Sequence, residues 1–407
     1  MLVINRKVVL FELFAIILFF CQFRLARKQG YILFPLEICI VCVFFFWNKR
    51  KLKVPSSPIL LYLFFIIYRI IVSLIMSGGD IENVKAIFYK ELGMLFVCWF
   101  LVEGYSKISV IKRIRNFGFI MAIFGCYEFV THSAVFMKYV TVESKMYMQV
   151  NLRTATMRAR SIFLHPTICG VFMTIAWLCV LFIPYRKKWL NYLAKIAIFL
   201  CLLGTQSRSN WIAFAIVNLL YIWKRYKKGR VHLKKRNFIR TTLLLVLALI
   251  IAVVFNEYIR NIYHLVINRW IEGMDSNNAG NYNRVTMIKM GLKEWTNFGI
   301  IEKLFGSGSG YAVTFLRKHP IRGWDAAVDN QYLSILLDFG LLGLILLLCL
   351  VGYIFRKVMV DDNEINQLCE LSLLSMFISA FFYDMFPWIT VTLIFSLFLC
   401  LIEKREY

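Results

Sequence analysis

Long apolar runs alternate with short polar segments along most of the 407-residue chain. The runs are roughly 16–25 residues long, enough to cross a hydrocarbon layer about 30 Å thick at about 1.5 Å per residue. The pattern predicts an all-α integral membrane protein with about 12 transmembrane helices, in a single polytopic domain over residues 1–407. The predicted spans cover 7–23, 31–47, 59–76, 86–103, 116–131, 162–184, 190–205, 209–223, 241–256, 329–355, 366–385 and 387–402.

The longest polar interruption, residues 257–328, is predicted to be a large, partly helical extracytoplasmic loop before the tenth span. Loops of this length are uncommon without structure of their own and are usually functional. Segments 262–267 and 285–292 have the spacing of short amphipathic helices, which we expect to lie on the membrane surface. The glycines of 306–310 predict a flexible turn.

Composition and charge support this interpretation, since 60% of the residues are hydrophobic and the net charge is +25. Lysines and arginines gather in the connections 48–58, 104–115, 185–189 and 224–240, which alternation of the spans places on one side. Basic connections mark the cytoplasmic side, so both termini are predicted to be cytoplasmic too. The first outer loop is an exception, because it is basic although alternation places it on the opposite side. Because the charge sets orientation, nucleic acid is not an expected partner.

Cysteines and sequence motifs give no sign of a metal or cofactor. Most of the 11 cysteines lie within apolar runs, where they act as small hydrophobic residues. Neither a disulfide framework nor a zinc site is indicated. No P-loop, GxSxG or HExxH motif is present, and the two carboxylates Asp325 and Asp329 are too few to predict a metal site.

The best candidate for chemistry is Arg208, in a polar break between two apolar runs that are too close together for a true loop. Charged side chains at membrane depth are costly and are functional candidates by default. An arginine at a helix N-terminus suits a phosphate group. The alternative is an anchor whose guanidinium reaches into the lipid headgroups.

Further candidates flank the loops. Arg160 and His165 lie where the chain enters the sixth span, with nearby Arg158 assigned to headgroups. Arg284 in the large loop is either functional or a solvated charge. Asp329 is either the N-cap of the tenth span or a general base. Asp338, deeper in that span, needs a partner, whereas the loop histidines His264 and His319 are not favoured.

Four elements, taken in order, resemble those of the O-antigen polymerase and O-antigen ligase superfamily over roughly 155–345. The resemblance rests on the order of these elements and their position around the large loop. They are Arg160 with His165, Pro166 and Gly170; Thr205, Ser207 and Arg208; Arg284 followed by Leu304–Gly308; and Asp329, Asn330, Tyr332 and Leu333 with Gly340–Gly343.

The resemblance implies a glycosyltransferase at the outer face of a bacterial plasma membrane. It would polymerise polyprenyl-diphosphate-linked oligosaccharide repeat units into a capsular, O-antigen or exopolysaccharide chain, by inversion and without metal or cofactor. Membrane lipids, a chain-length regulator and a flippase are further implied partners. The assigned roles are catalytic for Arg208, Arg160, Arg284 and Asp329, and substrate-binding for His165, Asn330, Tyr332, Asp325 and Trp324.

Three alternatives remain open. A ligase of the same superfamily differs only in its acceptor, and the family often has histidine where this chain has Asp329, which argues against ligation. A lipid-linked oligosaccharide flippase or other transporter fits the span count equally well but requires a polar path through the bundle. A structural subunit of an assembly complex is disfavoured by the clustered arginines.

Overall fold

The computed structural model describes residues 57–76, 81–104, 106–133, 135–136, 158–163, 165–227, 279–321 and 328–402. Regular secondary structure in these ranges is entirely helical, which confirms the all-α prediction. Two helices, α3 (Ser57–Met76) and α16 (Gln331–Val360), are long and apolar enough to cross a membrane. The number of spans remains a prediction, and the predicted spans 7–23, 31–47 and 241–256 lie outside the described residues.

The fourth and fifth predicted spans differ from expectation in detail. Helices α4 (Ile81–Ile87) and α5 (Met94–Gly104) are joined by a π-helical turn, η1 (Phe88–Gly93). Helix α6 (Lys107–Thr131) begins at Lys107 instead of 116. The reason is that Ser106 Oγ caps it by accepting from the Ser109 N–H at 3.2 Å, so the basic segment forms its first turns.

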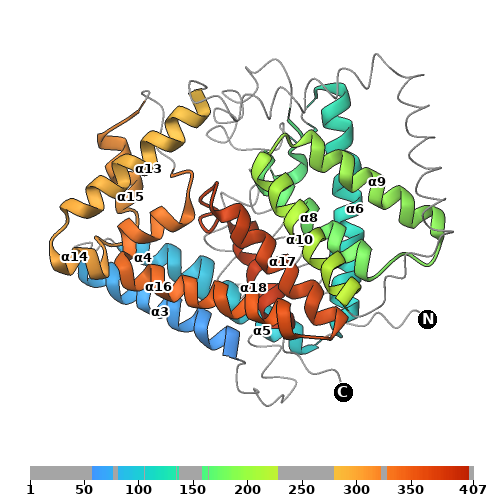
Figure 1. Cartoon of the computed structure of the whole chain (residues 1–407), viewed down its shortest axis with the longest axis horizontal. Coiled ribbons are helices and arrows are strands. Elements are labelled where there is room, and N and C mark those ends of the chain that lie inside the picture. Colours follow the sequence, from blue (N-terminus) through green and yellow to red (C-terminus); the bar gives the residue numbers. More distant parts are fainter. Residues whose placement is uncertain are drawn as a thin grey trace.

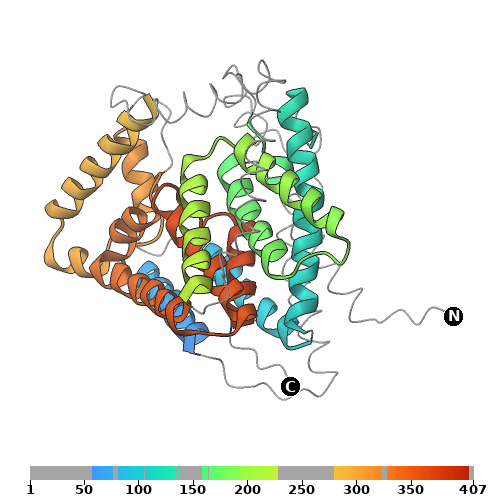
Figure 2. The same ribbon diagram turned by 45° about the vertical axis from the view of Figure 1, so that its right-hand side comes forward.

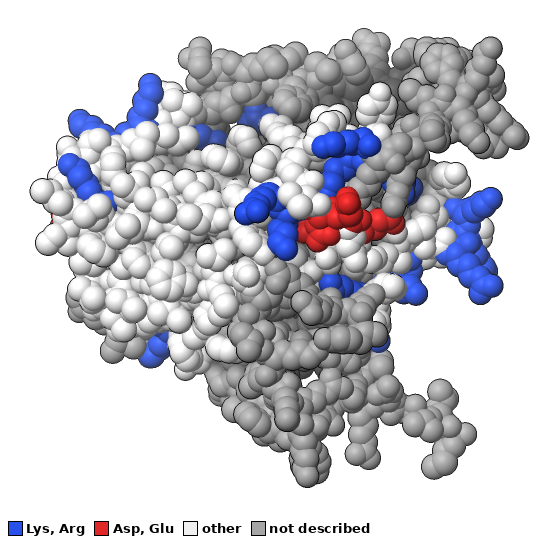
Figure 3. Space-filling view, turned by 60° about the horizontal axis from the view of Figure 1, so that its bottom comes forward, with Lys and Arg blue, Asp and Glu red and all other residues white. Residues whose placement is uncertain are grey.

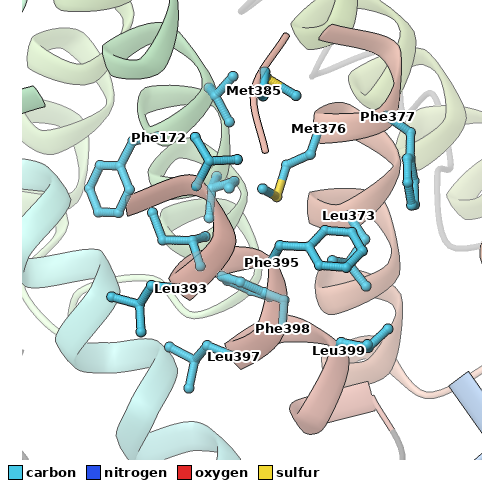
Figure 4. Close-up of a cluster of buried hydrophobic side chains, with 14 of the residues drawn as sticks. Phe172, Leu373, Met376, Phe377, Met385, Leu393, Phe395, Leu397, Phe398 and Leu399 are labelled. Atoms are coloured by element: carbon cyan, nitrogen blue, oxygen red, sulfur yellow. The ribbon is translucent and has the colours of Figure 1, made fainter. Parts of the chain in front are cut away.

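The remaining long helices pack with α5 and α6 into a bundle (Figures 1 and 2). Its core is formed by aliphatic and aromatic side chains, among them Phe172, Phe377 and Phe395 (Figure 4). The turn predicted around Pro387 is present, with the Trp388 N–H donating to Met385 O at 3.0 Å. The preceding helix ends at Ala380 and not at 385, so the connection extends over residues 381–388. The additional helices are α8 (Pro166–Phe182), α9 (Lys188–Gly204), α10 (Arg208–Lys227), α17 (Glu364–Ala380) and α18 (Ile389–Ile402).

Basic side chains fasten one end of this bundle. Lys107 Nζ donates to the carbonyl of Ile402 at 3.0 Å, and Lys224 Nζ donates to the carbonyl of Asp361. Arg225 forms an exposed ion pair with Glu364 at 3.6 Å. On the face that Figure 3 brings forward, acidic side chains are flanked by lysines and arginines. This end carries the connections predicted to be cytoplasmic, and its orientation in the membrane stays a prediction.

The large loop forms a small helical unit against α16, at the left of Figure 1. Helices α13 (Ala279–Asn297) and α15 (Tyr311–Lys318) share a second apolar cluster with α16, and α14 (Ile300–Phe305) connects them. The predicted helix at 285–292 is present within α13, and its Met287 packs into this protein core. Its position on the membrane surface stays a prediction. The predicted helix 262–267 lies outside the described residues. The buried residues of the second apolar cluster are Met287, Ala312, Phe315, Leu316, Val328, Leu333 and Leu337.

Helix α16 is broken at Gly340, where φ is 66° and ψ is −168°. The break leaves carbonyl groups without helical partners, and the glycine segment supplies them: the Ser307 and Gly308 N–H groups donate to Leu337 and Asp338 at 3.1 and 2.9 Å. The prediction of a flexible turn at 306–310 is wrong because these hydrogen bonds fix it. The Asp338 carboxylate finds its expected partners in the N–H groups of Gly310 and Ala312, at 2.9 and 2.8 Å.

Candidate functional site

Arg208 is the first residue of α10, as the polar break predicted. Helix α9 ends at Gly204, and Gln206 in the turn has a φ of 51°. Thr205 Oγ1 donates to the carbonyl of Leu202 at 2.7 Å and accepts from the Ser207 N–H at 3.3 Å. These bonds define a rigid turn that sets Arg208, half-buried, at a helix N-terminus.

The segment before α8 lies along this turn. The Ala159 N–H donates to Gly204 O, and Arg158 Nε donates to Thr205 O, both at 2.8 Å. Arg158 thus contacts backbone carbonyls of this turn, and its assignment to headgroups stays a prediction. Arg160 is only 1% exposed, and its N–H donates at 3.0 Å to Glu128 Oε2, a buried carboxylate that the sequence analysis did not identify.

His165 is the N-cap of α8, since its Nδ1 accepts from the Thr167 N–H at 3.2 Å. An accepting Nδ1 leaves the proton of the neutral ring on Nε2. The ring stacks on Tyr383, with centroids 4.6 Å apart, and lies 5.3 Å from Trp388. His165 therefore ties α8 to the turn between α17 and α18.

Asn210 joins three helices in the interior. Its Nδ2 donates to the Thr167 carbonyl of α8 at 2.7 Å and to Ser207 Oγ at 2.9 Å. Its Oδ1 accepts from Ser379 of α17 at 2.9 Å. A Cβ at Gly170 would lie 2.2 Å from Asn210 Nδ2, so this close approach requires glycine. The first and second motif elements are thus in direct contact.

The third and fourth elements also meet, through Arg284 and Asp329. Arg284 Nε lies 3.2 Å from Asp329 Oδ2, and the two side chains are 37% and 35% exposed. The N-cap interpretation of Asp329 is wrong, because Asn330 Oδ1 accepts from the Leu333 N–H at 3.0 Å and caps α16 instead. Tyr332 is buried, and its hydroxyl donates to the Phe377 carbonyl at 3.0 Å.

Replacing Asn330 with alanine is expected to destabilise the protein by about 1 kcal/mol, the usual effect of losing an N-cap. Asn330→Ser should retain stability, because serine caps nearly as well. Glycan synthesis by the serine variant separates the two roles. Activity retained in Asn330→Ser would identify Asn330 as a cap alone, whereas lost activity at normal stability would support substrate contact.

The turn of residues 381–388, which sequence analysis treated only as a connection, contacts both halves of the site. Gln331 Oε1 accepts from the N–H groups of Met385 and Phe386 at 3.0 and 2.9 Å. Ser334 Oγ donates to Asp384 Oδ2 at 3.1 Å. With His165 against Tyr383, the turn links α16 to α8. Asp384, a carboxylate between two apolar runs, was the signal in the sequence that could have identified this turn.

Of the remaining candidates, Trp324 and Asp325 lie outside the described residues. Tyr311 donates to Glu294, and its pKa is raised by burial and by this bond. His319 lies at the end of α15, with Nδ1 3.1 Å from Phe315 O. In the part of the chain that the structure describes, no group of three or more His, Cys, Asp or Glu residues is arranged to hold a metal.

A second omission is a buried ion pair between Arg69 of α3 and Glu91 of the π-helical turn. The Arg69 guanidinium also lies 4.7 Å from the Phe339 ring centroid, next to the break in α16. Tyr62 OH donates to the same carboxylate at 3.4 Å. Both charges stand within predicted spans, so their position alone was the available signal.

Comparison with known proteins shows a similarity to one family over part of the chain. Residues 193–348 match the family model described as O-Antigen ligase, a range that includes Arg208, Arg284 and Asp329. No curated protein matches the chain. Proteins of this family are glycosyltransferase-like integral membrane proteins that act on lipid-linked oligosaccharides. The chain thus carries, over residues 193–348, a region similar to O-antigen ligases, and its predicted resemblance to the O-antigen polymerase and ligase superfamily is confirmed.

Proposed function

We propose that this protein is a polymerase that joins polyprenyl-diphosphate-linked oligosaccharide repeat units at the outer face of a bacterial plasma membrane. The observation that supports this most is the convergence of separate motif elements on the turn of residues 381–388. His165 reaches the turn by stacking on Tyr383, and Gln331 reaches it by two hydrogen bonds. Arg208 begins α10, which contacts α8 through Asn210. Asp329, the partner of Arg284, lies two residues before Gln331 in the chain.

The chemistry requires stabilisation of a leaving lipid diphosphate. An acceptor hydroxyl attacks the anomeric carbon, the bond from that carbon to a diphosphate oxygen breaks, and the configuration inverts. Arg208, Arg160 and Arg284 supply positive charge to the departing diphosphate, which arginine binds well through paired N–H donors. Asp329 takes the hydroxyl proton, and its position beside Arg284 brings acceptor and donor groups to one place.

A ligase that transfers a finished glycan to another acceptor is the second candidate, because the matching family model carries that description. The polymerase is favoured by Asp329, which stands where the resembling family often has histidine. The two functions differ in the glycan they leave: a polymerase makes long chains from lipid-linked units, whereas a ligase moves chains already made.

Replacing Arg208 with alanine is expected to reduce chain synthesis about 10²-fold, the usual loss when one group that stabilises transition-state charge is removed. The measurement is the glycan profile of a deletion strain complemented with wild type, Arg208→Ala or Arg186→Ala at matched membrane levels. Arg186 is an exposed arginine in the short α8–α9 connection, at the other end of α8 from His165, and its variant should make normal chains.

Single repeat units in the deletion and in Arg208→Ala, with long chains from wild type, would support the polymerase. Long chains that accumulate on the lipid carrier in the deletion strain, without transfer to another acceptor, would instead identify a ligase. Lipid-linked units that remain on the cytoplasmic side would identify a flippase, and normal chains from Arg208→Ala would overturn the role of this arginine.

A further inference from the structure

Helix α14 presents an apolar face that the described residues around it cover only in part. Ile300 and Ile301 are 79% and 65% exposed, and Leu304 and Phe305 are each 39% exposed. At about 100° per residue these four side chains fall on one side of the helix. Glu302 and Lys303 occupy the other side. This is the arrangement of a helix that lies in the plane of a membrane interface.

The neighbouring helices α13 and α15 each bury apolar side chains, although α13 also leaves Val285 and Leu292 52% and 45% exposed. Met287 of α13 and Phe315 of α15 are buried in the second apolar cluster. No residue of α14 is buried, although the helix itself is held firmly. The Gly299 N–H donates to Glu302 Oε2 at 2.7 Å, and Trp295 Nε1 donates to the Lys303 carbonyl at 3.3 Å. A fixed helix that leaves two isoleucines mostly exposed beside two partly exposed apolar side chains indicates another partner.

The surface beside α14 indicates which partner. A Cβ at Gly340 would lie 2.4 Å from the Leu304 carbonyl, so α14 contacts α16 at its break. Just past the break, α16 exposes Leu341, Leu342 and Ile345, by 38%, 37% and 44%.

Helix α3 continues the same apolar surface. The Ser309 N–H donates to Ser73 Oγ at 3.3 Å, next to Leu74 and Ile75, which are 53% and 71% exposed. Since α3 and α16 are the described helices long and apolar enough to cross a membrane, α14 extends a lipid-facing surface.

We propose that α14 inserts Ile300, Ile301, Leu304 and Phe305 among the acyl chains of the bilayer leaflet on the side of the large loop. Glu302 and Lys303 then face the headgroups, where a lysine side chain can extend its charge to water. The partner is the lipid bilayer. The inserted helix holds the C-terminal end of α13 at the membrane, with Arg284 about 20 Å further along that helix.

The test uses a photoreactive benzoyl-phenylalanine introduced at residue 300 or 301, one at a time, in protein reconstituted in phosphatidylethanolamine–phosphatidylglycerol nanodiscs. Both positions are more than half exposed, so neither replacement should disturb folding. Matched controls carry the same amino acid at Lys289 or Lys318, exposed positions on α13 and α15. After irradiation, intact-protein mass spectrometry measures the fraction of protein that has gained the mass of a phospholipid.

Phospholipid adducts at 300 and 301 at least several-fold above the two controls are the expected result. Adducts no more frequent than at the controls would overturn the proposal. A crosslink to a second copy, seen as a doubled mass, would also overturn it and would assign this face to a protein–protein contact.

Discussion

Replacement of Glu91 with alanine is expected to lower the free energy of unfolding by about 3–5 kcal/mol, the usual cost of removing one partner of a buried ion pair. Arg69 and Glu91 have side chains only 8% and 5% exposed, so the loss of the carboxylate leaves a guanidinium in an apolar interior. Packing of Arg69 against Phe65 and Phe339 offsets little of this cost.

Thermal unfolding in detergent, followed with a thiol-reactive fluorescent dye, measures this effect because Cys98, Cys179 and Cys369 are buried until the protein unfolds. A decrease in Tm on the order of 10 °C is expected for Glu91→Ala. Glu364→Ala is the matched control, since its ion pair with Arg225 is exposed and should contribute less than about 1 kcal/mol. Equal Tm values for the two variants would contradict the argument.

A double variant, Arg69→Met with Glu91→Leu, separates charge burial from packing. Exchange of a buried ion pair for apolar side chains of similar volume is often neutral or stabilising. Recovery of Tm by the double variant is therefore expected. If the double variant recovers the wild-type Tm but makes no glycan chains, the ion pair has a role in function and not only in folding.

Alanine at Gly306 or Gly340 is expected to destabilise the protein by at least about 3 kcal/mol, from backbone strain added to steric overlap. The two residues have φ values of 80° and 66°. Their added Cβ atoms would lie 2.3 Å from the Asp338 carbonyl oxygen and 2.4 Å from that of Leu304. Both neighbours are backbone atoms, so they cannot move aside as a flexible side chain can.

The same thermal assay checks this prediction, with Gly352→Ala as control. Gly352 lies in α16, and a Cβ there would meet no atom within 4 Å. This control should be unchanged or more stable by up to about 1 kcal/mol, because alanine favours helix over glycine. An unchanged Tm for Gly306→Ala would show that the loop is not docked into the break of α16.

Local patterns in the sequence predicted much of the fold. The polar break before Arg208 and the tight turn at Pro387 are both where the sequence places them, because each depends on residues a few positions apart. The start of α6 was wrong, since charged residues in a helix are indistinguishable from a loop when only hydropathy is considered. The serine cap at Ser106 was the available correction.

Contacts between distant segments could not be predicted in the same way. The Arg284–Asp329 pair joins residues 45 positions apart, and Arg69 and Glu91 come from different helices. The apolar spacing of 285–292 predicted a helix, but spacing could not show that Met287 packs into a protein core. The resemblance supplied Arg160, Arg208 and Arg284 as candidates, whereas it did not supply the turn at 381–388.

The break at Gly340 has a consequence for how the chain is assembled during synthesis. A carbonyl group released by the break has no water to bind within a lipid layer and must find a donor in the protein. The donors, Ser307 and Gly308, precede the break in the chain, so they have already left the ribosome when α16 emerges. The order of synthesis therefore makes the donors available before the carbonyl groups that need them.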